Sequence, residues 1–556
     1  QGRTLVLNAR VTAPAGASIS YAWQRGEEDL SDGERISGSK DKTLKITEIG
    51  TPESETYTCR VTMTVDGQSA TLPHGDTEVT VLEPPSLAAP VFADRYVGEP
   101  VSYPVIASNH PSQFTATGLP PGVVINKQTG LISGSPIAAK LVQGENVAYR
   151  VTITVSNAAG KDSKSADWKI LPLPAGLAGS YHGLVAREGS LNRGLGGSFK
   201  LSVQPSASFS GQLTLGAKKH AFTGKLEVAG NGTLAEATIT IRRGSALADL
   251  NLVFSLHPAT GGLSGTVSFN GSEESSQITA RRSPWSKVEK PDAYVGTYNA
   301  ALQPQLPPEV LAGIYPEGEG YAILKITATG VATWSGRLAD GSAITCSTNL
   351  VQGGQVTLHS LSYKNTASVQ GWSTLSSPGK NLDGTLDWVK LNIENPGKER
   401  TYQEGFPRHP MTVVGGVYTP PPGGELLPAL APTSSNAQIT FVCDGALEPF
   451  TQSFSLTPGG KVTMPMNDTK LKLQLNAKTG IYNGSFTLTE PDPTSLLEVK
   501  PKVTRGASFS GALIQRLGRG AGYSLVPRLP ARAGEKTTQT PLFSGSASLT
   551  KAVSDN

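Results

Sequence analysis

The sequence holds few of the residues that carry chemistry and lacks the long apolar runs that cross membranes. Its 556 residues include only 3 cysteines and 4 methionines. So few cysteines exclude a disulfide framework and a thiolate zinc cluster. No apolar stretch approaches the roughly 18 residues of a membrane-spanning helix, so no membrane span is expected. The apolar spacing of a long amphipathic helix is also missing.

Charge is scarce and balanced. Charged residues make up 17% of the chain, and 48 Lys and Arg stand against 44 Asp and Glu, for a net charge of +4. A nucleic-acid surface needs Lys and Arg clustered on one face, and no such block occurs. We therefore expect no nucleic-acid partner. Low Cys, Met and charge, with abundant Thr, Ser, Gly and Val, is typical of secreted bacterial β-proteins.

What the sequence does contain is the periodicity of β-strands. The chain is also too long for one hydrophobic core, since single domains rarely exceed about 250 to 300 residues. Apolar and polar residues alternate in several stretches, as they do in half-buried strands. The 62 glycines and 40 prolines provide turns between them. The predicted fold class is all-β, with serial immunoglobulin-like sandwiches followed by three β-meander units closed as barrels or folded as sandwiches.

The first segment has the marks of one such sandwich. Trp23 is placed as the core tryptophan of an immunoglobulin domain. Tyr57-Thr-Cys59 follows it at the spacing of the tyrosine corner and the second cysteine of such a domain. Residues 1–84 therefore resemble an immunoglobulin-like domain. Ala9 stands where the first cysteine of such a domain is expected, so Cys59 is predicted to be a buried small hydrophobe without a local partner.

The same segment lacks the edge strand that normally opens an immunoglobulin-like domain. Only residues 1–3 precede the first expected strand, at residues 4–11. Two explanations stay open at this point. Either the chain is a fragment of a longer polypeptide, or another chain supplies the missing edge by strand addition.

A different turn-rich pattern follows. It reads GLPPGVVINKQTGLISGSP at residues 118–136 and YRVTITVSNAAG at residues 149–160. Residues 85–173 resemble, on this pattern, the putative-immunoglobulin, cadherin-like repeats of bacterial surface proteins. The resemblance implies a spacer domain without catalysis. Gly122, Gly130 and Gly134 are expected to supply positive φ angles at hairpin turns.

From residue 174 onward a degenerate repeat is visible. Its units open with Gly-x-Tyr and contain an aromatic or apolar residue, a small or polar residue and then Gly. We expect the first residue to pack inward and the glycine to allow a close backbone crossing. The copies are Phe209-Ser-Gly211, Phe222-Thr-Gly224, Leu263-Ser-Gly265, Trp334-Ser-Gly336, Leu382-Asp-Gly384, Tyr482-Asn-Gly484, Phe509-Ser-Gly511 and Phe543-Ser-Gly545.

The Gly-x-Tyr openings set the expected unit boundaries. They end at Tyr181, Tyr298 and Tyr418, and they predict units at residues 174–288, 289–411 and 412–556. The units resemble the uncharacterised glycine-punctuated β-repeats at the C-termini of large secreted proteins in Verrucomicrobia and related bacteria. That resemblance implies a secreted location and an architecture, with no activity attached.

No constellation of catalytic or metal-binding residues emerges. The histidines are scattered singly, without His-x-His or His-Glu-x-x-His spacing, and no Gly-x-Ser-x-Gly occurs. Acidic residues offer a glycosidase-like pair only by chance. The acids considered were Glu317, Glu319, Asp383, Asp387 and Glu394. We predict no catalytic residue, no cofactor and no metal.

Aromatic residues suggest one possible ligand surface. Trp372 and Tyr321 are the candidates for stacking on a sugar ring, as in carbohydrate-binding modules. Trp334 and Trp388 occupy positions that favour the core instead.

Two cysteines fall on expected strands of consecutive units. Cys346 and Cys443 form a disulfide if the two strands lie close enough, and sequence does not supply that distance.

These features favour a non-enzymatic, extracellular structural or adhesive protein of a bacterial surface. The more specific hypothesis is a subunit of a filament or appendage that assembles by strand addition. Its expected partners are further copies of itself or other surface proteins. The alternative is a carbohydrate-binding, polysaccharide-associated module of a larger secreted protein, with glycans as partners.

Overall fold

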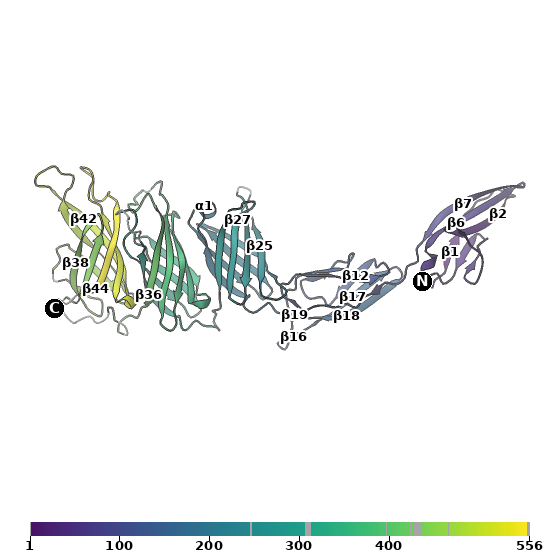
Figure 1. Ribbon diagram of the computed structural model, residues 1–556, viewed down its shortest axis with the longest axis horizontal. Coiled ribbons are helices and arrows are strands. Elements are labelled where there is room, and N and C mark those ends of the chain that lie inside the picture. The colour runs from purple at the N-terminus through teal and green to yellow at the C-terminus, as the bar shows by residue number, and fades with distance from the viewer. Residues whose placement is uncertain are drawn as a thin grey trace. The chain divides into compact units, whose positions relative to one another are not determined.

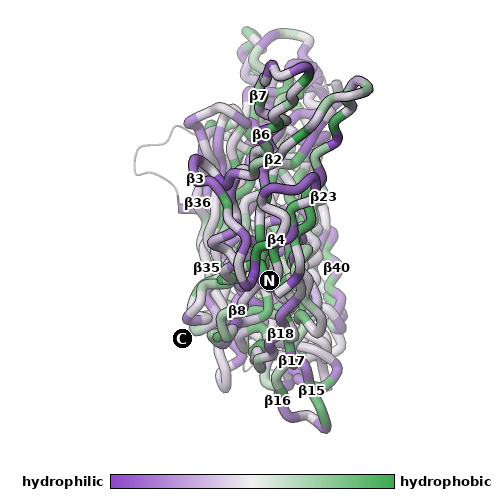
Figure 2. Tube along the Cα trace, turned by 90° about the vertical axis from the view of Figure 1, so that its right-hand side faces the viewer, coloured by the Kyte–Doolittle hydropathy of each residue, from purple (hydrophilic) through white to green (hydrophobic). Residues whose placement is uncertain are grey.

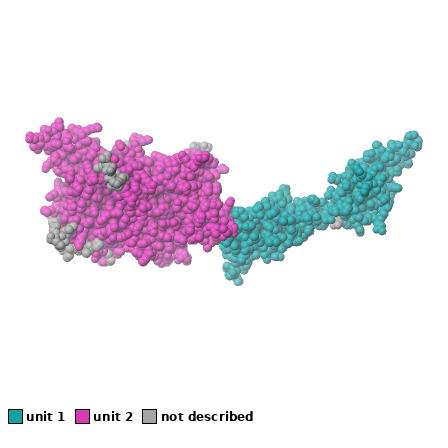
Figure 3. All heavy atoms as spheres, in the orientation of Figure 1, with its two compact units in different colours: residues 1–173 teal, residues 174–556 magenta. Residues whose placement is uncertain are grey.

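The computed structural model describes residues 2–244, 247–305, 313–395, 397–422, 425–427, 435–464 and 466–552. These residues are almost entirely in strands and turns (Figure 1), which confirms the all-β fold class. The chain divides into two compact units, residues 1–173 and residues 174–556 (Figure 3). Hydrophobic and hydrophilic residues are interspersed along the trace (Figure 2), as half-buried strands require.

The first unit begins with a two-sheet sandwich. One sheet has the strand order β1-β5-β4 and the other β3-β2-β6-β7. The elements are β1 (Leu5–Asn8), β2 (Ser18–Arg25), β3 (Glu28–Asp29), β4 (Ile36–Ser37), β5 (Thr43–Ile46), the 3₁₀ turn η1 (Thr51–Glu53), β6 (Glu55–Val65) and β7 (Gln68–Val79).

The core of this sandwich is the one that the sequence predicts. Ala9, Trp23 and Cys59 are buried in a common cluster. The hydroxyl group of Tyr57 donates a hydrogen bond to the backbone oxygen of Glu53 (3.1 Å), which is the geometry of a tyrosine corner. Cys59 is fully buried and free, so the prediction of a small hydrophobe without a partner is confirmed.

The second domain of this unit consists of short strands joined by tight turns. Its strands are β8 (Ser86–Leu87), β9 (Arg95–Tyr96), β10 (Val101–Pro104), β11 (Ala107–Ser108), β12 (Gln113–Thr117), β13 (Val123–Ile125), β14 (Leu131–Gly134), β15 (Lys140–Val142), β16 (Glu145–Val147), β17 (Tyr149–Asn157), β18 (Gly160–Trp168) and β19 (Ile170–Leu171).

Glycine is required at the turns where it was expected. Gly122, Gly130 and Gly134 have φ angles of 91°, 72° and 123°, which confirms the prediction of positive φ. At Gly130 there is also no room for a side chain, because a Cβ atom would lie 2.7 Å from the ring of Phe114.

The second unit contains three large, nearly closed antiparallel sheets. The first is built from β20 (Gly179–Val185), β21 (Gly197–Val203), β22 (Ser208–Leu215), β23 (Lys218–Lys225), β24 (Glu227–Val228), β25 (Ala235–Ile241), β26 (Leu250–His257), β27 (Gly262–Phe269) and β28 (Ser275–Ser283). The short helix α1 (Gly189–Asn192) lies between β20 and β21.

The second sheet contains β29 (Gly296–Pro304), β30 (Gly320–Ile326), β31 (Val331–Arg337), β32 (Ala343–Asn349), the 3₁₀ turn η2 (Gln352–Gly354), β33 (Gln355–Ser362), β34 (Ala367–Leu375), β35 (Asn381–Lys390) and β36 (Phe406–Val417). The third contains β37 (Ala437–Cys443), β38 (Leu447–Leu456), β39 (Val462–Thr463), β40 (Lys472–Asn476), β41 (Ile481–Pro491), β42 (Lys502–Ile514), the 3₁₀ turn η3 (Gln515–Leu517), β43 (Arg519–Pro527) and β44 (Leu542–Lys551).

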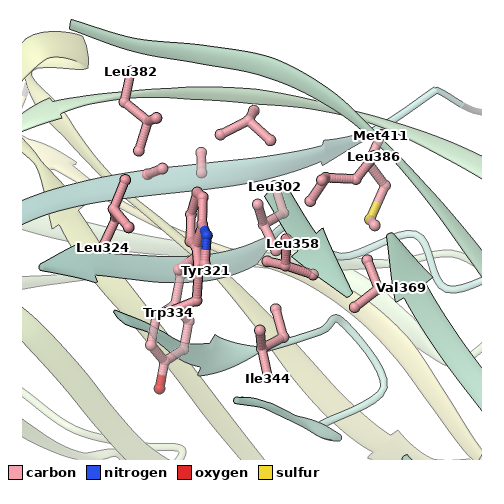
Figure 4. Close-up of a cluster of buried hydrophobic side chains, with 14 of the residues drawn as sticks. Leu302, Tyr321, Leu324, Trp334, Ile344, Leu358, Val369, Leu382, Leu386 and Met411 are labelled. Carbon is pink, nitrogen blue, oxygen red and sulfur yellow. The ribbon is translucent and has the colours of Figure 1, made fainter. Parts of the chain in front are cut away.

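Each of these sheets is a meander whose first strand pairs with its last. The closing pairs are β20 with β28, β29 with β36, and β37 with β44, all antiparallel. The ladder is interrupted in the middle of each meander, between β23 and β24, between β32 and β33, and between β39 and β40. The interior of the second sheet is filled by inward-pointing Leu, Val, Ile and Trp side chains (Figure 4).

The second sheet ends later than the expected boundary between residues 411 and 412. That boundary falls inside β36, which pairs with β29 on one side and β35 on the other. Tyr181 and Tyr298 each donate a hydrogen bond to the backbone oxygen four residues earlier, at Leu177 and Tyr294. Tyr418 follows the last strand of the second sheet, but its side chain packs in the core of the third sheet and its hydroxyl group donates a hydrogen bond to the backbone oxygen of Ala477 (2.7 Å).

The repeated glycine motif has a simple physical basis in the first sheet. On adjacent strands β22 and β23, Phe209 is directly opposite Gly224, and Phe222 is directly opposite Gly211. Each aromatic ring therefore covers the glycine of the partner strand. A Cβ atom on Gly224 would lie 2.6 Å from Cζ of Phe209.

The same reciprocal arrangement recurs in the third sheet. On strands β41 and β42, Tyr482 is opposite Gly511 and Phe509 is opposite Gly484. Tyr482 and Phe509 are buried, as the motif predicted. The glycine thus provides the space into which the ring of the neighbouring strand packs.

Replacing Gly511 by Ala is expected to lower the free energy of unfolding by about 1 to 3 kcal/mol, the usual cost of overpacking a core. The added Cβ atom would meet the Tyr482 ring and would lie 2.5 Å from the backbone oxygen of Ala521. Gly506→Ala is the matched control, because it lies on the same strand with open space around it. Urea unfolding of both variants checks this prediction, and equal losses would contradict it.

Candidate functional site

The first domain has an open side. Strands β1 and β7 are the terminal strands of their two sheets, and each has a ladder partner on one side alone within the described part of the domain. In an immunoglobulin sandwich the strand order is ABED on one sheet and CFG on the other. Strands β1, β5 and β4 correspond to B, E and D, and β1 is the terminal strand of this sheet within the described residues.

A groove of 420 Å³ runs along this side. Its lining comes from β1 and the residues after it, from β7, and from the core tryptophan. The lining residues are Val6, Leu7, Asn8, Ala9, Arg10, Trp23, Gly75, Asp76 and Thr77.

The groove suits an extended peptide. Its floor includes the buried side chains of Ala9 and Trp23, whereas Arg10 and Asp76 at the rim are exposed. A strand placed here would point alternate side chains at the floor and at solvent. Edge-strand backbone groups supply affinity in this mode of recognition, and pockets for alternate side chains supply specificity.

The residues that line the groove were only partly marked in the sequence. Val6 and Arg10 both lie within the first expected strand, at residues 4–11, and that position is the available signal. The sequence did not predict that Gly75 and Asp76 line the groove, because a bulge in β7 places them there. There Thr58 is opposite Asp76, Cys59 is opposite His74, and Gly75 is the extra residue between them.

The two residues expected to stack on a ligand lie in different environments. Tyr321 is buried, and its hydroxyl group forms a hydrogen bond of 3.0 Å with that of Ser510 in the third sheet. It is therefore not available for stacking. Trp372 is half-buried and points outward from β34, since its neighbours in the strand, Gly371 and Ser373, point inward.

Trp334 and Trp388 are core residues, as predicted. Both are almost completely buried in the second sheet. The indole nitrogen of Trp334 donates a hydrogen bond to the backbone oxygen of Thr357 (3.0 Å).

Cys346 and Cys443 are free thiols, so the bridge considered between them is not formed. Cys346 belongs to a pocket of 290 Å³ that also includes Lys200 and Lys219 of the first sheet. Cys443 ends β37, where burial raises its pKa to about 12 and the nearby carboxylate of Glu317 adds to the shift. The two thiols thus belong to different surroundings.

The acidic residues considered as a catalytic pair are mostly engaged in ion pairs. Asp383 bonds to Arg516 (2.6 Å), Asp387 to Arg408 (2.7 Å) and Glu319 to Arg519 (2.6 Å). Glu394 is exposed. The remaining acid is Glu317, whose pKa is raised by burial and by the charge of Asp444.

The described residues contain no group of at least three His, Cys, Asp or Glu side chains placed to hold a metal ion. In the same part of the chain, no helix has both the length and the apolar character needed to cross a membrane.

Several histidines are buried and neutral. His409 lies among aromatic rings, with Tyr315 stacked on it at 5.1 Å and Phe406 at 6.0 Å between ring centroids. Burial lowers the pKa of His409 to about 4, and it does the same for His182 in the first sheet.

Comparison with known proteins identifies the second domain. Residues 84–171 match the family model described as "Putative Ig domain". This segment is immunoglobulin-like. A comparison with curated proteins finds no match for the chain.

Solved structures with immunoglobulin domains also resemble the chain. The amphioxus IgVJ-C2 molecule is 21% identical, with 30% of this chain and 96% of that chain covered and a TM-score of 0.22. An I-band fragment of titin is 12% identical, with coverages of 41% and 93% and a TM-score of 0.24. The insect immune protein hemolin is 15% identical, with coverages of 30% and 43% and a TM-score of 0.19.

The buried histidines predict that the protein loses stability in acid. A histidine in the unfolded chain titrates near pH 6.5, above the folded value of about 4 for His409. The unfolded state therefore binds more protons below about pH 6.5, so the free energy of unfolding is highest above that pH and falls toward pH 4.

His409→Phe should reduce this loss by up to about 3 kcal/mol between pH 7 and pH 4, because the phenylalanine does not titrate. Denaturant unfolding at several pH values measures it. His257→Phe is the control, since His257 is exposed. An unchanged pH dependence in His409→Phe would contradict the assignment of a buried neutral histidine.

Proposed function

We propose that the protein is a non-enzymatic, extracellular structural or adhesive element of a bacterial surface, assembled by strand addition into a filament or appendage. The observation that carries this proposal is the groove between β1 and β7, which are the terminal strands of their sheets among the described residues. An edge strand is a template for pairing with another chain.

The proposed occupant of the groove is an extended segment of a second copy. The loop between β41 and β42 has the required apolar side chains: Leu496, Leu497 and Val499 are 102%, 67% and 85% exposed. Leu497 and Val499 flank Glu498, so they alternate as a strand in the groove must. The near-balanced charge of 48 basic and 44 acidic residues leaves little repulsion between copies.

Such a contact joins two different surfaces of the same chain. A contact of this type is heterologous, and it produces an open filament when the rotation between successive copies does not close a ring. The second unit would then act as a spacer and the first as the connector. The extracellular, bacterial location is supported by the composition and by the immunoglobulin-like domain at residues 84–171.

The groove can be blocked by a charge. Val6 is 47% exposed on β1, and Val6→Lys places a cation at the edge where the second copy would pair. We expect this variant to stay monomeric at concentrations at which the parent chain forms oligomers in light scattering and ordered polymers in electron micrographs. Leu497→Asp together with Val499→Asp should have the same effect.

Val253→Lys is the matched control, since Val253 is 38% exposed but lies on β26, which is paired on both sides. A parent chain that remains monomeric at high concentration would refute self-assembly. Assembly that persists in Val6→Lys would show that a different surface is responsible.

One observation favours the alternative function, a carbohydrate-binding module. Trp372 points outward with Thr385 directly opposite on β35, and Thr412 is opposite Thr385 on β36. An indole beside a row of hydroxyl groups offers both a stacking face and hydrogen bonds to a sugar.

If this surface binds glycans, Trp372→Ala should abolish the binding and Trp372→Phe should retain part of it, because a smaller stacking ring remains. A glycan array followed by calorimetry with each variant measures this. Binding that is equal in the parent chain and in Trp372→Ala would exclude this surface, and a blank array would leave assembly as the proposed function.

A further inference from the structure

The second sheet contains a buried amine beside a buried carboxylate. Lys390 ends β35, and Asp340 lies in the turn between β31 and β32. Nζ of Lys390 is 3.5 Å from Oδ2 of Asp340, and both side chains have 0% exposure. Burial lowers the pKa of Lys390, which favours the neutral amine, while the charge of Asp340 opposes that shift.

The carboxyl group of Asp340 is held by donors on both oxygens. Oδ1 accepts hydrogen bonds from the backbone N–H of Ser342 (3.0 Å) and from its hydroxyl group (2.6 Å). Oδ2 accepts a hydrogen bond from the hydroxyl group of Tyr363 (2.7 Å). Two donors on one oxygen form the arrangement that stabilises negative charge in acyl transfer.

The amine is also fixed in place. Nζ of Lys390 donates hydrogen bonds to the backbone oxygen of Thr401 (2.7 Å) and to its Oγ1 (3.4 Å). It lies 3.5 Å from the centre of the Tyr363 ring. The hydroxyl group of Tyr363 is 3.1 Å from Oγ1 of Thr401. A continuous path of hydrogen-bonding groups therefore leads from the amine to Oδ2 of Asp340.

The backbone around the tyrosine is strained. Tyr363, Lys364 and Asn365 have φ angles of 49°, 53° and 68°, in the left-handed region that costs an ordinary residue about 1 to 2 kcal/mol. Strain of this kind persists where the surrounding structure enforces a particular placement, and it concentrates at sites with a function. Here the turn brings the Tyr363 hydroxyl group to Asp340.

Stability alone explains this cluster poorly. A buried ion pair often contributes no more than well-packed apolar residues of the same volume, because removing two charges from water is costly. An amide bond between the same two groups would remove both charges and would join β35 to the turn after β31. Closure of a long loop by a covalent bond restricts the unfolded chain and raises stability.

We propose that Lys390 and Asp340 form an intramolecular amide bond. Nζ of Lys390 bonds to Cγ of Asp340, and the bond from Cγ to Oδ2 breaks. The ammonium group has three protons. One moves to Oδ2 before the attack and frees the lone pair of the amine, a second follows so that Oδ2 leaves as water, and the third remains on the amide nitrogen. No oxidant, reductant or further reactant is needed.

The neighbouring groups have separate roles in this step. The two donors of Ser342 stabilise the charge that develops on Oδ1 in the tetrahedral intermediate. The Tyr363 hydroxyl group donates a hydrogen bond to the leaving oxygen Oδ2, and Oγ1 of Thr401, which itself donates to the carboxylate of Glu399, accepts one from Nζ. The fixed distance between amine and carboxyl removes the entropy cost of bringing two separate groups together, which is part of the barrier to amide formation.

Intact-mass spectrometry of the purified full chain tests the proposal. We expect a mass lower than that of the sequence by one water molecule. Lys390→Arg and Asp340→Ala should each have the full mass of their sequences, because neither can form the amide. Tyr363→Phe keeps the ring but loses the hydroxyl group, so the bond should form more slowly after refolding, by about a hundredfold.

Peptide mapping of the parent chain locates the lost water without relying on variants that fold poorly. Trypsin should not cleave after Lys390, and fragmentation should show one branched peptide containing both Asp340 and Lys390. This also separates the proposal from dehydration at Asp340-Gly341 alone, where a succinimide would lose the same mass but leave the amine of Lys390 free.

A full-mass parent chain with a normal tryptic cleavage after Lys390 would overturn the proposal. So would loss of water confined to the Asp340 peptide. The result does not depend on strand addition, because the bond lies within one chain and is read from its mass.

Discussion

The structure depends on aromatic rings packing over glycines of the neighbouring strand. A meander closes when its strands curve. Curvature brings inward-pointing side chains so close that they overlap, unless some of the inward positions are glycines. Phe209 and Phe222 in the first sheet, and Tyr482 and Phe509 in the third, each lie opposite a glycine. In these two sheets the glycines therefore determine where bulky side chains fit, and the rings compensate for the packing that a glycine cannot provide.

The sheets of the second unit are joined by polar side chains that reach from one to the next. Arg187 of the first sheet donates hydrogen bonds to Ser368 and to the backbone oxygen of Asp387 in the second. Arg519 of the third sheet binds Glu319 of the second through two hydrogen bonds. Arg guanidinium groups suit these positions because their fixed fork satisfies several acceptors at once. These contacts connect each sheet of the second unit to the next.

Much of the fold followed from the sequence, but the sites did not. Trp23, Tyr57 and Cys59 identified the first sandwich because their spacing reflects a core that few other folds require. The boundary between residues 411 and 412 was misplaced because Gly-x-Tyr at Tyr418 looks like the openings at Tyr181 and Tyr298, although it follows the closing strand β36. Tyr321 is a candidate for stacking in the sequence, which does not reveal that the third sheet covers this side chain.

The sequence by itself determined the all-β class, the glycine-marked hairpins and the core of the first domain, since these arise from period, turn chemistry and neighbours in the chain. The tertiary structure decided which residues meet across long separations. Asp340 and Lys390 are 3.5 Å apart because turns at the same end of the second sheet converge there. The groove joins β1 to β7 because two sheets pack face to face. Such long-range contacts depend on the strand order and on the closure of the sheets, which are properties of the folded chain as a whole.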